Sequence, residues 1–91
     1  MTDSTFNQFL NRPVVLDTGG PMLYLGTLAQ VTPSAFILTD ADVRDSRLGH
    51  ANSDVYVNEA RRNGIVANRR RVVVMRSVVM SVSLIEDVIL E

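Results

Sequence analysis

The chain has 91 residues, a formal net charge of −1, one histidine and no cysteine. That length supports one small core, and a hydrophobic content of 46% argues against a disordered chain. With no cysteine and one histidine, a disulfide framework and a Cys/His metal site are excluded. No apolar run has the roughly 18 residues of a membrane span, and residues 1–12 lack the features of a secretory signal. We expect one cytoplasmic domain, residues 1–91, without metal, cofactor or membrane contact.

All nine basic residues are arginine. Six of them lie between residues 61 and 76, in a stretch without any acid. The rest of the chain is acidic, which argues against a protein that coats nucleic acid with its whole surface. A local basic patch is still expected on this stretch. Valine occurs fourteen times, and its branched side chain favours β-strands.

The first predicted element is a short N-terminal helix over residues 3–11. The side chain of Asp3 or Ser4 would cap it by accepting a free backbone N–H. Pro13 limits the helix because the residue before a proline avoids helical backbone angles. A helix this short is not stable alone, so it must pack on the rest of the chain. A strand over residues 14–16 follows the helix.

Alternating apolar residues then predict a strand over residues 22–31 and another over residues 35–39. Gly26 lies inside the first of these strands, where glycine marks a bend, a bulge or a close backbone approach. The second strand is expected to end at residues 40–42. Residues 43–53 are polar and predict a loop.

Ser53 or Asp54 begins a predicted helix that reaches Arg62 or Asn63, although its Val-Tyr-Val segment would also suit a strand. Gly64 is a good helix stop, since glycine tolerates the left-handed cap conformation. Together with the preceding loop, this helix forms an insertion, residues 43–68, between the third and fourth strands.

A strand is predicted over residues 70–75, and its continuous apolar run over residues 72–75 indicates burial on both faces. Alternation predicts a last strand over residues 78–84, and the apolar residues 88–90 should pair or pack. Five bent strands with tight turns favour a small closed or nearly closed β barrel. So much valine on a short chain suggests that oligomerisation completes the burial.

Two stretches match the motifs of a known family. The first motif is an apolar strand, a turn, Gly-x-Leu, a second turn and a strand that ends in Asp-Ala. Residues 14–17, 26–28 and 36–41 match its strands and its Gly-x-Leu. The second is an apolar pair, Arg-Gly and a Val/Ile strand, and residues 74–82 are similar to it. The chain therefore resembles the Sm/LSm family over residues 4–41 and 69–85.

The resemblance implies an Sm-like, SH3-type small barrel of five strongly bent antiparallel strands with a short N-terminal helix. It also implies a homo-oligomeric ring, a hexamer or heptamer, in which the fourth strand pairs with the fifth strand of the next copy. Such rings bind single-stranded RNA near the central pore. The expected function is non-catalytic RNA binding or RNA chaperoning.

The family binds RNA through two loops, and this chain departs from the pattern in both. The aspartate of the first loop falls on Thr32, and its asparagine falls on Ala35 or Phe36. In the second loop Arg76 is retained, and Ser77 replaces glycine. The candidate RNA contacts are base stacking by Arg76 and hydroxyl contacts by Ser77 and Thr32. Phe36 either stacks on a base or belongs to the core, and Arg76 either contacts RNA or pairs with a carboxylate of a neighbouring copy.

Arg69, Arg70 and Arg71 are further candidates for RNA binding, because three guanidinium groups can hold phosphates. The alternative is a solvated start of the fourth strand, or pairing with the acids of residues 40–54 in a neighbouring copy. His50 is expected to be an inert surface residue. The second candidate function is a structural or protein-interaction ring that has lost RNA binding.

Overall fold

The computed structural model describes residues 5–48 and 53–90. Its five strands form one antiparallel sheet in the order β4-β3-β2-β1-β5. One α-helix and three short 3-10 helices (η) accompany the sheet in the described chain. In chain order the elements are η1 (Thr5–Phe9), β1 (Pro13–Asp17), β2 (Met22–Val31), β3 (Ala35–Asp45), α1 (Ser53–Asn63), β4 (Arg69–Met75), η2 (Arg76–Val78), β5 (Ser81–Leu84) and η3 (Ile85–Asp87). The expected mostly-β fold with a helical insertion is confirmed.

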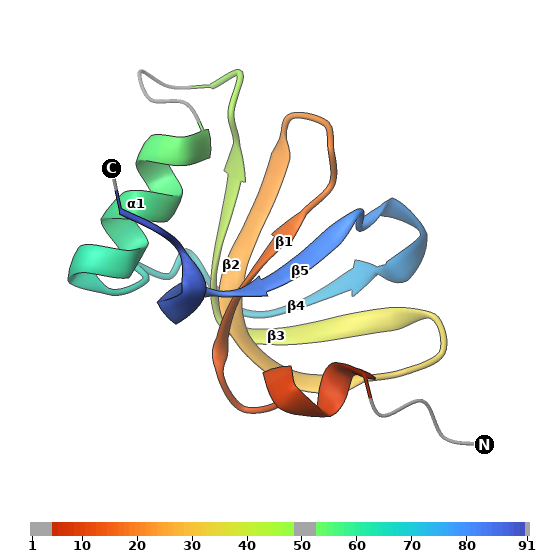
Figure 1. Ribbon diagram of the computed structural model, residues 1–91. Coiled ribbons are helices and arrows are strands. Elements are labelled where there is room, and N and C mark those ends of the chain that lie inside the picture. The colour runs from red at the N-terminus through yellow and green to blue at the C-terminus, as the bar shows by residue number, and fades with distance from the viewer. Residues whose placement is uncertain (1–4, 49–52, 91) are drawn as a thin grey trace.

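The sheet is strongly bent but does not close into a barrel, which corrects the expectation from the sequence. β4 and β5 form its two edges and do not pair with each other in the described chain. The chain turns through η2 between them, and β5 is only four residues long. Both edges therefore keep unpaired backbone donors and acceptors in the single chain. Figure 1 shows the strands spreading as a fan, with α1 on one side and η1 at the far end.

Gly26 lies where β2 bends against β3. A Cβ atom at this position would be 3.1 Å from the Cα atom of Ala41, closer than side chains normally approach a backbone. The register of the two strands shifts between Leu25 and Thr27. The glycine thus allows the close backbone approach that its position in the strand predicts.

β3 is longer than the sequence predicts. It passes through Asp40, which adopts a left-handed φ of 49°, and continues to Asp45, which pairs with Met22. The expectation that the strand ends at residues 40–42 and that a loop begins at residue 43 is therefore wrong. Asp tolerates the left-handed conformation better than most residues, so the turn signal marks a bend inside a strand.

Buried side chains form two clusters, because successive residues of a strand point to opposite faces of the sheet. The first cluster packs against η1 and consists of Val14, Leu16, Leu28, Phe36, Leu38, Ala41, Val74 and Leu84. The second packs against α1 and η3 and consists of Val15, Leu23, Leu25, Ala60 and Ile85. The inserted helix therefore covers a sheet face that would otherwise be exposed.

β4 is less buried than its apolar run predicts. Val73 and Met75 are 47% and 53% exposed, whereas Val74 is buried. β4 is an edge strand that pairs only with β3, so its outer face is not covered within the chain. The expectation of burial on both faces is wrong for the single chain.

Other boundaries also differ from the expectations. The helix expected over residues 3–11 is the 3-10 helix η1, and its proposed caps, Asp3 and Ser4, lie outside the described residues. The strand expected over residues 78–84 is shortened to β5 because η2 precedes it. His50 also lies outside the described residues.

The apolar residues after η3 pack only in part. Val88 lies against the second cluster, whereas Ile89 is 87% exposed.

Among the described helices none is long and apolar enough to cross a membrane.

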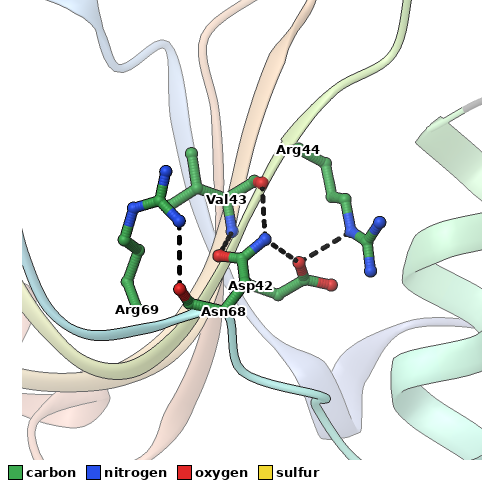
Figure 2. Close-up of polar contacts among 5 residues, drawn as sticks. All are labelled: Asp42, Val43, Arg44, Asn68 and Arg69. Carbon is green, nitrogen blue, oxygen red and sulfur yellow. Dashed lines mark hydrogen bonds and ion pairs between the residues drawn. The ribbon is translucent and has the colours of Figure 1, made fainter. Parts of the chain in front are cut away.

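Asn68 joins the end of the insertion to β3, as Figure 2 shows. Its side-chain amide accepts a hydrogen bond from the Val43 N–H at 2.9 Å and donates to the Val43 carbonyl at 3.0 Å. It also donates to the carboxylate of Asp42, which forms an ion pair of 2.7 Å with Arg44. Arg44 in turn lies 5.1 Å from the ring centroid of Tyr56 on α1. These contacts fix the insertion against the sheet.

Candidate nucleic-acid interface

Arg76 directly follows β4, as the first residue of η2, and contacts the turn between β2 and β3. Its backbone N–H donates to the carbonyl of Ser34 at 2.9 Å. Its guanidinium Nη1 donates to the carbonyl of Thr32, also at 2.9 Å. The structure therefore brings together the two loops to which the resemblance assigned RNA contacts.

The hydroxyl of Thr32 is used inside its own turn. It accepts hydrogen bonds from the backbone N–H groups of Ser34 at 3.3 Å and Ala35 at 2.9 Å. This pattern stabilises a tight turn and holds the Thr32 carbonyl toward Arg76. Thr32 thus positions the arginine in this structure. Its hydroxyl also donates to the Ala35 carbonyl at 3.4 Å, and its contact with RNA stays a prediction.

Two phenylalanine rings lie beside the Arg76 guanidinium. The guanidinium carbon is 4.9 Å from the ring centroid of Phe6 and 5.4 Å from that of Phe36. The two centroids are 5.2 Å apart and the rings meet edge to face. These three distances form a nearly equilateral triangle, so both rings lie on the same side of the guanidinium. Arg76 is partly exposed, so part of its side chain is accessible to a ligand.

The Arg76 guanidinium keeps most of its hydrogen-bonding capacity. A guanidinium has five N–H donors, and one of them is used by the Thr32 carbonyl. Within residues 5–48 and 53–90, no carboxylate pairs with this side chain. Such a group can donate to phosphate or base oxygens, and a guanidinium plane can also stack on a base.

Two surface hollows meet at Phe6 and Arg76, which line both of them. The first has a volume of about 320 Å³ and lies between η1 and the start of β5, where Phe9 and Val82 form part of its wall. The second has a volume of about 530 Å³ and lies between η1 and the β2–β3 turn. Both volumes are in the range of roughly 300–1,000 Å³ that is typical of small-molecule sites.

The other two residues predicted at these loops have different surroundings. Ser77 is exposed beside Arg76, where its hydroxyl is accessible. Phe36 is only 3% exposed and belongs to the first core cluster. Two roles were left open for Phe36, and the structure shows the core role. Its ring also meets the ring of Phe6 edge to face.

Arg69, Arg70 and Arg71 lie at the opposite end of β4 from Arg76. All three are exposed, and no carboxylate forms an ion pair with them in the described part of the chain. A strand rises about 3.3 Å per residue, so the backbones of Arg71 in β4 and Arg76, just after β4, are roughly 16 Å apart. The arginine triplet and Arg76 therefore form separate parts of the surface.

Phe6 is the site residue that the sequence did not reveal. It lies in η1 and packs against the first cluster. Its contact with Arg76 joins positions that are far apart in the chain. Local periodicity carries no signal for such a contact, so only the packing of η1 on the sheet reveals it.

No family model, curated protein or solved structure matches this chain. The resemblance to the Sm/LSm family therefore stays a prediction from the sequence motifs.

Proposed function

We propose that this protein is a non-catalytic RNA-binding protein of the Sm-like type, with Arg76 as its central contact. The observation that supports this best is the arrangement around Arg76. Its guanidinium lies against two aromatic rings, keeps uncommitted donors and is partly exposed, and the residue lines two hollows. Single-stranded RNA offers both groups that such an arginine binds, namely flat bases and phosphates.

We further propose that copies of the chain assemble edge to edge into a ring. Both edges of the sheet are unpaired in the single chain, and β4 exposes Val73 and Met75. Pairing of β4 with β5 of another copy would satisfy backbone groups and cover these side chains. Because the two edges differ, this contact is head to tail, and such contacts close into rings when the rotation allows it.

The test of RNA binding compares two arginine variants. Labelled single-stranded RNA nonamers are titrated with the wild-type protein, Arg76→Ala and Arg47→Ala at about 50 mM salt, where phosphate contacts are strongest. Arg47 is a matched control because it is exposed and pairs with Asp45 outside the site. Charge-assisted hydrogen bonds contribute about 1.5–3 kcal/mol, so we expect Arg76→Ala to weaken binding at least tenfold. Arg47→Ala should bind as the wild type does.

The proposal fails if the wild-type protein binds no RNA at low salt, or if both variants weaken binding equally. Size-exclusion chromatography with light scattering gives the mass of the assembly. The chain has no tryptophan and two tyrosines, so bound RNA would dominate its ultraviolet absorbance.

One observation favours the second candidate, a ring that binds protein rather than RNA. The Arg76 side chain ties the end of β4 to the β2–β3 turn through its hydrogen bond to the Thr32 carbonyl, and it also packs beside Phe6 and Phe36. An arginine with this structural role would be retained even without RNA. In that case Arg76→Ala lowers the stability or the mass of the assembly, and no RNA affinity is present to be lost.

A further inference from the structure

The hollow between η1 and the β2–β3 turn contains two amide side chains that the RNA-binding hypothesis did not include. Asn7 of η1 and Gln30 of β2 both line this hollow together with Arg76. Both side chains are exposed. Neither forms a side-chain hydrogen bond within the described chain, so their donors and acceptors are available to a ligand.

The rest of this hollow is mainly apolar. Leu10, Ala29, Val31 and Pro33 contribute to its wall. Apolar walls with a few polar groups and one cation suit a flat, partly polar and anionic ligand. A nucleobase with its phosphate has this chemistry, because the base buries its faces and offers donors and acceptors at its edge.

The smaller hollow, between η1 and the start of β5, is lined by an amide side chain that is already hydrogen-bonded within the chain. Gln8 lines that hollow, but its Nε2 donates to the carbonyl of Thr5 at 3.0 Å within η1. This hollow is also the smaller of the two, at about 320 Å³ against 530 Å³. The uncommitted amides therefore distinguish the two hollows, although Phe6 and Arg76 line both.

We propose that the hollow formed by Asn7, Gln30 and Arg76 is a nucleobase pocket. In this pocket the two amides bond the edge of one base of single-stranded RNA, while Arg76 stacks on the base or bonds its phosphate. This inference rests on the proposed RNA-binding function and adds the part of the site that would select among bases. A side-chain amide carries both a donor and an acceptor, so it can distinguish bases whose edges differ.

The test uses the affinity ratio between two RNA probes, a labelled adenylate nonamer and a labelled uridylate nonamer. The wild type, Asn7→Ala, Gln30→Ala, Gln8→Ala and Arg76→Ala are titrated with each probe. One hydrogen bond is worth about 1 kcal/mol, or roughly fivefold in affinity. We expect Gln30→Ala and Asn7→Ala each to reduce the preference for one probe by about that factor. Gln8→Ala is the matched control and should leave the ratio unchanged.

The ratio separates base recognition from general damage, because a loss of folding weakens binding to both probes equally. The pocket is disproved if Arg76→Ala weakens binding but Gln30→Ala and Asn7→Ala leave the ratio unchanged. A changed ratio in Gln8→Ala alone would move the base to the smaller hollow and would also overturn the proposal. If the wild-type protein binds neither probe, the proposed function fails as well.

Discussion

At the scale of single residues, the properties of Arg76 depend on its neighbours. Its contacts are two aromatic rings and a carbonyl, and no carboxylate neutralises it in the described chain. Phe6 and Phe36 lie on one side and restrict the directions that the guanidinium can take. A side chain held in this way loses less conformational entropy when it binds a ligand.

Phe6 should therefore contribute to RNA affinity by positioning Arg76. A cation–π contact at a partly exposed site is worth about 0.5–1 kcal/mol. We expect Phe6→Leu to weaken RNA binding about two- to fivefold, while Phe6→Tyr, which keeps an aromatic face, binds as the wild type does. The measurement is the same RNA titration.

Phe9→Leu is the matched control for Phe6→Leu. Phe9 also packs on the first cluster, but its ring has no cation–π contact with Arg76 in the described chain. If Phe9→Leu and Phe6→Leu weaken binding equally, the effect comes from the packing of η1. The positioning role of Phe6 would then be rejected.

At the scale of elements, α1 is part of the packed structure. Ala60 is buried in the second cluster, and Tyr56 contacts both this cluster and Arg44. At the end of the insertion, Asn68 bonds Val43 as a strand residue would. The insertion therefore covers one face of the sheet, and its end at Asn68 is tied to β3.

Asn68→Ala should loosen the end of the insertion. The change removes three hydrogen bonds, to Val43 and to the buried carboxylate of Asp42. A net loss of about 1–3 kcal/mol is expected, because a buried carboxylate loses a donor. Urea unfolding at a fixed protein concentration measures the free energy, and hydrogen exchange reports on the Val43 amide.

Asn63→Ala is the control for this change. Asn63 is exposed at the end of α1 and donates a single hydrogen bond, to Glu59. A surface pair of this kind contributes about 0.5 kcal/mol or less. If both variants change stability and exchange to the same extent, Asn68 does not have the anchoring role described here.

At the scale of the whole molecule, the charges near the two sheet edges are complementary. The triplet Arg69–Arg71 begins β4, and Glu86 and Asp87 follow β5 in η3. In antiparallel pairing between copies, the start of β4 lies near the end of β5 of the next copy. The unpaired arginines of one copy would then lie near the acids of its neighbour.

A charge exchange tests this arrangement. We expect Arg71→Glu and Asp87→Arg each to weaken assembly about two- to fivefold per contact, since exposed ion pairs contribute about 0.2–1 kcal/mol. The double variant should recover part of the loss, because the two charges are then opposite again. Light scattering across a dilution series measures the assembly.

The same variants distinguish phosphate binding by the triplet from pairing between copies. If the triplet holds phosphates, Arg71→Glu weakens RNA binding and leaves the mass of the assembly unchanged. In that case Asp87→Arg would not compensate for it. That outcome would reject the charge pairing between copies.

The sequence predicted the elements whose signals are local. Alternation of apolar residues located β2, and a capping residue and a terminal glycine located α1 at both ends. It failed for β3, because a residue that favours turns was accommodated as a bend inside the strand at Asp40. The position of Arg76 in the connection between two strands was also predictable, because the strands on both sides of it have local apolar signals.

The sequence alone determined the mostly-β composition, the order of the strands along the chain and the placement of the insertion. These follow from periodicity and turn residues that act over a few positions. The tertiary structure decided which distant residues meet: Phe6 with Arg76, Asn68 with Val43, and the arginine triplet apart from Arg76. It also decided that β4 is an exposed edge. Contacts of this kind depend on strand order, register and packing, which no local pattern encodes.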